Sequence, residues 1–315
     1  MLRAVLLGNG SREGVLEGVA KLRPEIERYV EVVAADFNDL VDLSNVAADI
    51  AIVFGGDGSI LRSVHQMGEN QLPILAVNLG TLGFLSSVDP AEVAPFLASE
   101  SFKRIAIREQ LLLNCSVWRK KKVGVDPPSF RAYSPQLSSR ALPTHWLSDV
   151  GNRYCYSNYL VVNEVALRSV APFSILKIDL AVDGEHVTTY RGDGLIVATP
   201  VGSTGHSLSA GGPILRNDID SVVISPIAPL ALNFRPVVDS ASRIFEMQAL
   251  AGEVFLVIDG DSRMKLTRDD LVVIRRAPFS FKMISVPENK YYKNLRRKLN
   301  WGVDQIDPRG SAGNR

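Results

Sequence analysis

A short run of small and acidic residues is the sharpest chemical signal in the chain. Residues 55–59, Gly-Gly-Asp-Gly-Ser, follow the apolar run 50–54 and precede a helical pattern. Glycines at such a turn let a ligand approach the main chain, and the start of a helix offers unpaired N–H groups to an anion. A carboxylate beside phosphates is repulsive unless it holds a metal, accepts a proton or hydrogen-bonds a hydroxyl. The run therefore predicts a site for phosphate with a hydroxyl or a metal. A purely structural Asp-Gly turn, with Ser59 capping the helix, would have the same sequence.

Two further motifs place polar residues at the ends of predicted strands. Residues 78–85, Asn-Leu-Gly-Thr-Leu-Gly-Phe-Leu, follow the apolar run 73–77, and Asn163-Glu164 ends the run 159–162. Ligands of open α/β sheets bind at the carboxyl ends of the strands, and an amide beside a carboxylate can hold a nucleobase edge or a ribose. A tight connection or a polar strand terminus would also explain these motifs, so neither decides the chemistry alone.

The richest stretch covers residues 190–212, where a predicted strand lies between two glycine-rich polar turns. Arg191 and Asp193 precede this strand and can recognise phosphate and ribose hydroxyls. Several hydroxyl side chains follow it around a predicted helix start: Ser203, Thr204, Ser207 and Ser209. Folding alone needs few such residues in one place, so the stretch favours ligand binding.

Spacing argues against several common sites. Residues 8–14 resemble a dinucleotide fingerprint, but the third glycine falls one place late, which argues against hydride transfer. Ser203 and Ser207 lack the frame of a nucleophile elbow, and no Gly-x-x-x-x-Gly-Lys-Ser/Thr loop occurs. The four histidines show no metal-ligand spacing. Only His206, inside the stretch 190–212, is a candidate for touching a ligand.

The elements that must position these motifs are of two kinds, one in the first hundred residues and one in the later part of the chain. In the first hundred residues, short apolar runs such as 50–54 and 73–77 alternate with helical patterns, which predicts parallel strands with crossover helices. Later apolar runs are short and separated by turns such as Asp183-Gly184, which predicts mostly antiparallel strands. We therefore expect an α/β N-terminal domain with a Rossmann-like parallel sheet over 1–104, and a β-rich, mostly antiparallel domain over 105–285.

Two segments stand apart from this scheme. Residues 119–153 carry four prolines and few apolar runs, which predicts a long loop insertion. Residues 286–315 are expected to form a C-terminal helix that packs back on the N-terminal domain, followed by a disordered tail from Gly310. The basic face of this helix, over 291–301, is interpreted as a solvated surface.

Composition limits the class of protein. The 315 residues are 46% hydrophobic and 22% charged, as in soluble globular proteins. The net charge of +1 argues against a protein that coats nucleic acid or an anionic membrane. No apolar run approaches the ~20 residues that span a bilayer, and two cysteines cannot make a disulfide framework. We therefore expect a cytoplasmic protein in a reducing compartment, and an enzyme.

In their order along the chain, the motifs resemble those of the NAD kinase family. Gly-Gly-Asp-Gly, the 78–85 motif and Asn-Glu are followed by three more matches: Gly-Asp-Gly-Leu-Ile-Val at 192–197, Thr-Pro-x-Gly-Ser-Thr at 199–204 and Ser-Leu-Ser-Ala-Gly-Gly-Pro-Ile-Leu at 207–215. Shorter matches are Ser225-Pro226-Ile227, Phe234-Arg235-Pro236, Asp259-Gly260 and 295–301. One motif would be weak, but this ordered set, over roughly residues 50–301, is specific. The resemblance implies transfer of the γ-phosphoryl of ATP to the 2′-hydroxyl of the adenosine ribose of NAD, giving NADP.

The resemblance also implies roles for individual residues. Asp57 matches the catalytic base, and phosphoryl transfer needs a group that accepts the hydroxyl proton. The implied NAD-binding residues are Asp57, Gly58, Asn163, Glu164, Arg191, Asp193, Thr204, Gly205, His206, Ser207, Leu208 and Ser209. The residues expected to bind the phosphates of ATP are Gly55, Gly56, Gly58, Ser59 and Arg62. We also expect a divalent metal, Mg²⁺, with unidentified ligands, NAD(H) and ATP as partners without nucleic acid or membrane, and a homodimer or homotetramer.

Three departures and three alternatives qualify the resemblance, and the first departure is the long insertion 119–153, which could cover the active site or mediate assembly. Ser59 replaces a common threonine, and His206 replaces a common tyrosine, so an imidazole charge could tune the choice between NAD and NADH. Sugar-phosphate and lipid kinases share Gly-Gly-Asp-Gly, but the former would lack the Asn-Glu and Thr-Pro-x-Gly-Ser-Thr set and the latter should show a membrane-binding patch. A non-catalytic NAD-binding sensor is a different class, against which an intact Asp57 argues.

Overall fold

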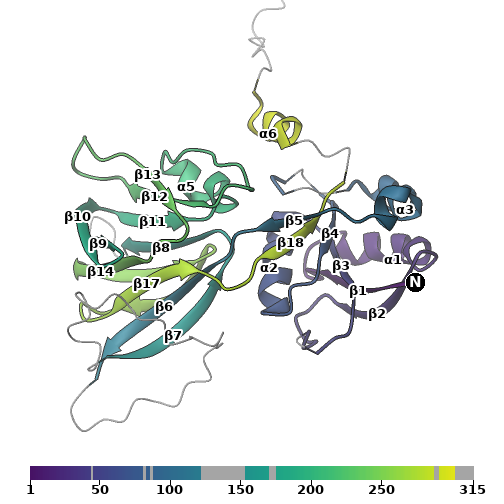
Figure 1. The fold of residues 1–315 in the computed structure, drawn as a ribbon, viewed down its shortest axis with the longest axis horizontal. Coiled ribbons are helices and arrows are strands. Elements are labelled where there is room, and N and C mark those ends of the chain that lie inside the picture. The colour runs from purple at the N-terminus through teal and green to yellow at the C-terminus, as the bar shows by residue number, and fades with distance from the viewer. Residues whose placement is uncertain are drawn as a thin grey trace, which may run out of the picture.

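The computed structural model describes residues 1–43, 45–80, 83–85, 88–121, 153–169, 175–286 and 291–301. The predicted insertion, apart from its ends, and the predicted tail lie outside these residues. Two regions stand side by side, an α/β region and a β-rich region, with the C-terminal helix near their junction (Figure 1). No helix among the described residues is long and apolar enough to cross a membrane.

The first region is built on a six-stranded sheet in the order β2-β1-β3-β4-β18-β5. Its strands are β1 (Leu2–Gly8), β2 (Val30–Asp36), β3 (Ile50–Phe54), β4 (Ile74–Val77), β18 (Phe281–Ile284) and β5 (Ile107–Gln110). The pairings among β2, β1, β3, β4 and β18 are parallel, and β5 is antiparallel to β18. Every residue of β3 and β4 is buried, because helices cover both faces of the sheet.

Alternate residues of the same strands supply two separate cores. Val5, Leu7, Ala51 and Val53 pack with helix α2 (Asp57–Met67). Their neighbours Ala4, Leu6, Ile50 and Ile52 pack on the opposite face with α1 (Val15–Ile26) and α3 (Val93–Ala98). The short elements η1 (Pro90–Glu92) and α4 (Glu100–Lys103) flank α3. The crossover helices predicted from the alternating pattern are therefore present.

Two strands of this sheet come from the part of the chain that was predicted to form the β-rich domain. β5 and β18 lie inside the range 105–285, which the sequence assigned to the second domain. The chain thus leaves the first sheet after Gln110, builds the β-rich region, and returns at Phe281 to fill the place between β4 and β5. The pattern of apolar residues does not predict this return, because a short buried strand has the same apolar pattern whichever sheet it joins.

The second region is a pair of six-stranded sheets whose pairings are all antiparallel among the described residues. One has the order β10-β9-β14-β17-β6-β7, with β6 (Leu113–Lys120), β7 (Arg153–Val161), β9 (Leu176–Val182), β10 (Glu185–Gly192), β14 (Phe245–Ala251) and β17 (Leu271–Arg276). The other has the order β13-β12-β11-β8-β15-β16, with β8 (Glu164–Ser169), β11 (Gly194–Ala198), β12 (Ser221–Ile227), β13 (Val237–Ser240), β15 (Val254–Ile258) and β16 (Asp261–Leu266). Inward-facing residues of both sheets form one core. The predicted fold class, an α/β domain followed by a mostly antiparallel β-rich domain, is confirmed.

The polar motif after one predicted strand is shared between a bend and the next strand. Asn163-Glu164 was expected to end the run 159–162, but β7 ends at Val161 and Glu164 already begins β8. Val162 and Asn163 form a bend between the two sheets, so the chain changes sheet at this point. Asn163 has a polar side chain that suits such a bend better than a strand interior.

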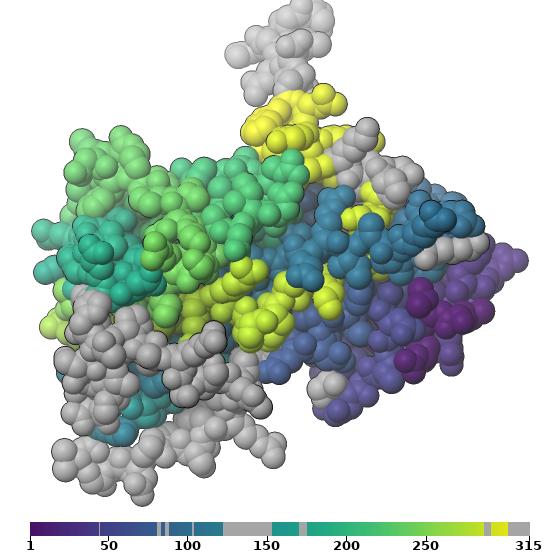
Figure 2. Space-filling view, in the orientation of Figure 1, coloured from purple at the N-terminus to yellow at the C-terminus, as the bar shows by residue number. Residues whose placement is uncertain are grey.

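The two regions meet on one face of α2. Leu160, Val162 and Val201 of the β-rich region belong to the same hydrophobic cluster as Ile60 and Val64 of this helix. Above this junction lies the C-terminal helix α6 (Tyr291–Leu299), yellow in Figure 2 between the green and blue parts of the surface. The start of α2 and the bends of the β-rich region are therefore neighbours.

Candidate active site

The Gly-Gly-Asp-Gly turn joins β3 to α2 and presents the start of that helix. Gly55 has a φ of 131°, and a Cβ at this position would collide with the hydroxyl of Ser59, so only glycine fits. Gly56 and Gly58 face open space, whereas Ser59 is buried. Because the first N–H groups of a helix have no partner within it, this end of α2 can receive the oxygens of a phosphate.

The carboxylate of Asp57 is held by the loop that follows β4. Oδ2 accepts a hydrogen bond from the N–H of Phe84 at 2.8 Å, and Oδ1 accepts one from the N–H of Leu85 at 3.2 Å. A Cβ on Gly83 would collide with this carboxylate, so the loop can approach it only through a glycine. The predicted motifs 55–59 and 78–85 therefore meet at Asp57.

Burial raises the pKa of Asp57 above its ordinary value, although the N–H groups of Phe84 and Leu85 and the charge of Lys298 oppose the change. A carboxylate that is fixed in orientation and more basic than usual is suited to accept a proton. Asp57 is only half-buried, so a substrate can reach it.

Helix α6 brings a positive charge to this site. Lys298 Nζ lies 5.7 Å from the centre of the Phe84 ring, and its charge acts on Asp57. The Tyr291 hydroxyl at the start of the helix donates to the carbonyl of Leu215 at 3.2 Å. The sequence interpretation of this basic face as solvated surface missed Lys298, because nothing in the local pattern shows where the end of the chain folds back.

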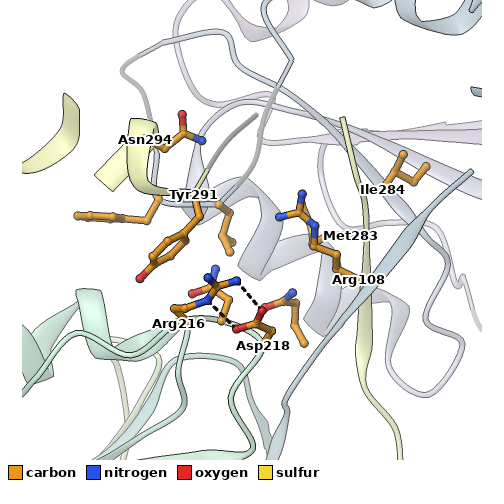
Figure 3. Close-up of a pocket in the computed structure, with 11 residues that line it drawn as sticks. Arg108, Arg216, Asp218, Met283, Ile284, Tyr291 and Asn294 are labelled. Atoms are coloured by element: carbon orange, nitrogen blue, oxygen red, sulfur yellow. Dashed lines mark hydrogen bonds and ion pairs between the residues drawn. The ribbon is translucent and has the colours of Figure 1, made fainter. Parts of the chain in front are cut away.

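A small cavity borders the loop that holds Asp57. Its volume is about 40 Å³, and Phe84, Leu85, Arg108, Arg216 and Tyr291 are among its lining residues. The Arg108 and Arg216 side chains extend toward its centre, where Arg216 makes a two-point contact with Asp218 at 3.0 and 2.8 Å (Figure 3). Two guanidinium groups therefore lie just beyond the loop beside Asp57.

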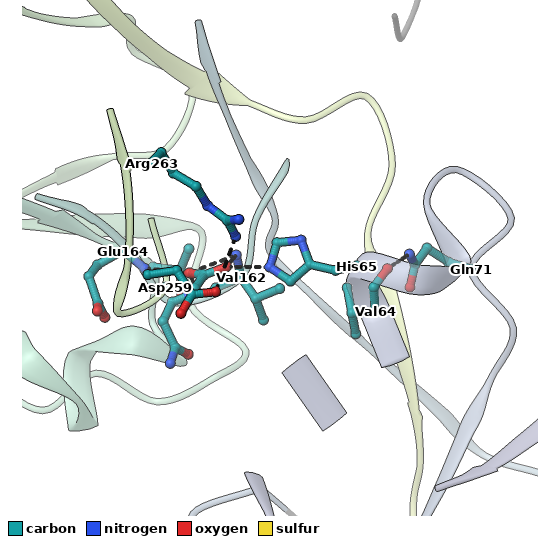
Figure 4. A network of polar contacts seen from close by, with 10 residues as sticks. Val64, His65, Gln71, Val162, Glu164, Asp259 and Arg263 are labelled. Carbon is teal, nitrogen blue, oxygen red and sulfur yellow. Dashed lines mark hydrogen bonds and ion pairs between the residues drawn. The ribbon is translucent and has the colours of Figure 1, made fainter. Parts of the chain in front are cut away.

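The Asn163-Glu164 turn is fixed by an acid that the sequence analysis did not include among the site residues. Asp259 accepts hydrogen bonds from the N–H groups of Asn163 at 2.6 Å and Glu164 at 3.0 Å (Figure 4). It also lies 2.7 Å from Nε2 of His65 on α2. In the sequence, Asp259-Gly260 is only a family match and His65 is not a ligand candidate, and their pairing could not be predicted because 194 positions separate them.

Glu164 is a buried acid with spare bonding capacity. The residue is 4% exposed, and its Oε2 has no hydrogen-bond partner among the described residues. Burial, together with the nearby charge of Asp259, raises the pKa of Glu164 to about 7. An unpartnered buried carboxyl oxygen is costly unless a ligand bonds to it, so this atom is suited to hold a ligand hydroxyl or amine.

The stretch after β11 packs directly against this turn. Thr199 donates to the carbonyl of Val162 at 2.7 Å, and the N–H of Gly202 donates back to Thr199 at 3.0 Å. A Cβ on Gly202 would collide with the main chain of Asn163, and one on Gly205 would lie 3.5 Å from Oε2 of Glu164. The stretch 199–205 and the Asn163-Glu164 turn therefore form one surface.

Several hydroxyls of the stretch serve the fold rather than the surface. Ser203 donates to the carbonyl of Pro200 at 2.6 Å, Ser207 bonds Ser225 at 2.9 Å, and Thr204 donates to Val201 at 3.1 Å. These bonds shape the turns η3 (Gly202–Thr204) and α5 (His206–Ser209). The density of small polar residues, which the sequence analysis attributed to ligand binding, thus has a partly structural cause.

The remaining predicted residues of this stretch are accessible. Gly205 and Ser209 are exposed, and His206 and Leu208 are half-buried. Burial, and the nearby charge of Arg168, lower the pKa of His206. A neutral imidazole is therefore the favoured form at this position.

Arg191 and Asp193 are not brought to this surface, and Arg62 on α2, which was predicted to bind phosphate, already has a partner. Arg191 and Asp193 lie before β11, whereas Glu164 pairs with Ala198 at its end, which is five residues or roughly 17 Å beyond Asp193 at about 3.3 Å per residue. Arg62 forms an ion pair with Asp39 at 2.6 Å. Among the described residues no group of three or more histidine, cysteine or acidic side chains is placed to hold a metal ion.

Comparison with known proteins gives a consistent result. Residues 16–101 match the model of the ATP-NAD kinase N-terminal domain, and residues 162–286 match that of the ATP-NAD kinase C-terminal domain. The chain is 40% identical over 301 residues to a protein named NAD kinase from Rhodopirellula baltica, covering 95% of this chain and 86% of the relative. It is 34% identical over 259 residues to the NAD kinase of Geobacter sulfurreducens, covering 82% and 80%.

Solved structures agree in fold. Yeast NADH kinase complexed with NADH superposes with a TM-score of 0.76 at 22% identity, covering 96% of this chain and 89% of the other. An NAD kinase from Archaeoglobus fulgidus in complex with ATP superposes with a TM-score of 0.69 at 24% identity, covering 95% and 99%.

Proposed function

This chain belongs to the NAD kinase family, and on that premise we propose that it transfers the γ-phosphoryl of ATP to the 2′-hydroxyl of the adenosine ribose of NAD. The products are NADP and ADP. The observation that carries this proposal is the Asp57 carboxylate, oriented by two main-chain N–H groups at the start of α2 and facing the junction of the two regions.

In the proposed reaction, Asp57 accepts the proton of the ribose 2′-hydroxyl while the oxygen of that hydroxyl forms a bond to the γ-phosphorus. The bond from that phosphorus to the β,γ-bridging oxygen breaks, and ADP leaves with the electron pair. The raised pKa of Asp57 makes it a stronger base than an exposed aspartate. Gly56 and Gly58 leave room for the triphosphate beside the N–H groups that open α2.

A magnesium ion would neutralise the charge of the triphosphate during transfer. Such an ion usually keeps several waters and is bound partly by substrate phosphates, which leaves the Asp57 carboxylate free to accept the proton. This donor set fits a metal that arrives with the nucleotide. Activity is therefore expected to depend on added magnesium.

The dinucleotide would occupy the surface formed by the Asn163-Glu164 turn and the stretch 204–209. The unpartnered Oε2 of Glu164 would accept a hydrogen bond from a ribose hydroxyl or donate one to a base nitrogen, since its pKa of about 7 allows both forms near neutrality. Half-buried His206 and Leu208 would provide contact area for a base. Ser207 is buried and bonded to Ser225, so we assign it to supporting this surface.

Arg191 and Asp193 would bind the dinucleotide only from a second copy of the chain, because their own copy holds them at the far end of β11. We therefore propose a homo-oligomer whose β-rich regions meet. Mixing an Asp57→Asn chain with an Asp193→Asn chain tests this, since mixed oligomers should recover activity that neither variant has alone.

The deciding experiment is incubation with NAD or NADH, ATP and magnesium, followed by detection of NADP or NADPH. The proposal expects product with the wild type and none without a nucleoside triphosphate. A folded wild-type protein that binds NAD but makes no product would instead favour a non-catalytic sensor. Product formed from a lipid or a sugar phosphate, and not from NAD, would indicate another kinase of the Gly-Gly-Asp-Gly group.

A further inference from the structure

A polar contact joins the two regions of the molecule beside the proposed site. His65 Nε2 lies 2.7 Å from Asp259 Oδ2, with side chains that are 29% and 4% exposed (Figure 4). Because the contact is mostly shielded from water, it is stronger than an exposed pair of the same length. It links α2 of the first region to the turn between β15 and β16 of the second.

The carboxylate of Asp259 does more than its turn requires. Asp259 and Gly260 have φ angles of 51° and 86°, as a two-residue hairpin turn demands, and asparagine would satisfy that geometry equally well. The carboxylate instead reaches across to the segment between β7 and β8. Its oxygens accept the N–H groups of Val162 at 2.9 Å, Asn163 at 2.6 Å and Glu164 at 3.0 Å. One acid therefore sets the conformation of the turn that presents Asn163 and Glu164.

The histidine lies on the same helix as Asp57. It follows Asp57 by eight residues, which is about 12 Å along α2 at 1.5 Å per residue. Beside it, Ile60 and Val64 of α2 pack in one cluster with Val162, so apolar contact surrounds the polar one. A continuous path of contacts thus runs from Asp57 along α2, through His65 and Asp259, to the Asn163-Glu164 turn.

We propose that His65 and Asp259 are a positioning pair, which fixes the Asn163-Glu164 turn relative to Asp57 across the junction of the two regions. The inference rests on the proposed function, in which Asp57 acts on a ribose held by that turn. Neither residue of the pair touches the reacting atoms. Its contribution is alignment, and in such reactions a displacement of about 1 Å can lower the rate by roughly 10²-fold.

Two substitutions of His65 separate positioning from packing. His65→Phe keeps a planar ring and removes the donor, whereas His65→Gln places an amide N–H where Nε2 lies. We expect His65→Phe to lower kcat by about 10- to 100-fold, with the KM values for NAD and ATP changed by less than about threefold, and His65→Gln to restore most of kcat. The matched control is Gln66→Ala, which removes hydrogen bonds to Asp36 at 2.6 Å and Val41 at 3.3 Å within the first region. This control should lower the melting temperature and leave kcat unchanged.

A second pair of variants tests the acid. Asp183 has the same turn geometry, with a φ of 50° before Gly184 at 77°, and its carboxylate accepts the N–H of Ile244 at 2.8 Å. Asp183→Asn should therefore keep kcat, while Asp259→Asn should lower it as His65→Phe does. In the double variant of His65 and Asp259, the loss of kcat should be smaller than the two single losses combined, because both changes break the same His65–Asp259 contact.

The outcomes distinguish the inference from the function on which it rests. A wild type that binds NAD and makes no NADP refutes the proposed function. With an active wild type, the positioning pair is refuted if His65→Phe keeps kcat, if His65→Gln loses as much as His65→Phe, or if Gln66→Ala lowers kcat equally.

Discussion

Replacement of Asp57 by asparagine tests the base assignment with little change of shape. The asparagine side chain cannot accept the hydroxyl proton, and loss of a general base typically lowers the rate by about 10²- to 10⁴-fold. At about 1.4 kcal/mol per factor of ten, this corresponds to a loss of roughly 3 to 5 kcal/mol of transition-state stabilisation. NAD should still bind, since the Asn163-Glu164 turn and the stretch 204–209 are untouched.

The fold should tolerate this change. Asparagine keeps one oxygen for the N–H of Phe84 or Leu85 and turns its amide toward the other, which costs about 1 kcal/mol. In the opposite direction, burial raises the pKa of Asp57, so the folded protein carries its charged form at a cost that a neutral amide avoids. The two effects oppose each other, and the melting temperature should stay within a few degrees of the wild type.

The assay is the rate of NADP formation at saturating NAD, ATP and magnesium, with NAD affinity measured separately by calorimetry. Asp36→Asn is a matched control. Burial acts to raise the pKa of Asp36, but hydrogen bonds from Val41, Asn38 and Gln66 outweigh it and lower the pKa. That variant should therefore lose stability and keep its turnover. A purified, folded Asp57→Asn protein with wild-type turnover would show that Asp57 is not the base.

Further predictions concern the charge and shape of the site. Glu164 has its pKa raised from 4.5 to about 7, so its contribution to stability is complete below pH 4.5 and is lost as the pH rises through 7. The free energy of unfolding of Glu164→Gln, measured in urea, should therefore rise relative to that of the wild type as the pH increases from 5 to 8. The rise should reach up to about 3 kcal/mol at 1.36 kcal/mol per pKa unit. A difference between variant and wild type that is the same at pH 5 and pH 8 would contradict this reasoning. Gly202→Ala should destabilise the protein by about 1–3 kcal/mol because the new Cβ meets main-chain atoms. Gly56 faces open space, so Gly56→Ala should have the same melting temperature as the wild type. Lys298→Met should raise the pKa of Asp57 further and so shift the acid limb of the kcat profile to higher pH, and an unmoved limb would show that the lysine charge is screened. Chelation of magnesium should abolish NADP formation, with recovery on its addition.

The predictability of the site from sequence depended on how local each interaction is. The Gly-Gly-Asp-Gly turn was predictable because its glycines, strand and helix are contiguous, and Gly55 does adopt a conformation that excludes other residues. The approach of Phe84 and Leu85 to Asp57 followed from two neighbouring parallel strands ending at one edge. These parts are fixed by chain geometry over a few residues.

Contacts between distant segments were not predictable in the same way. His65 carries no local mark of its partner Asp259, and Asp259 reads as an ordinary hairpin residue. Ser207 reads as a ligand hydroxyl, although its partner Ser225 lies 18 positions away inside the fold. Such assignments require the packing of separate strands, which a periodic pattern of apolar residues does not specify.

The insertion of β18 between β4 and β5 has a consequence for synthesis. While the chain emerges from the ribosome, Val88 can already bond to the edge of β4 near Val77, but the part of this edge near Ile74 stays open until residues 281–284 have been made, more than two hundred positions after β4 ends at Val77. A nascent or prematurely terminated chain would thus expose an apolar edge that other strands can join. The first sheet is completed only when nearly the whole polypeptide is available, which couples folding of the first region to completion of translation.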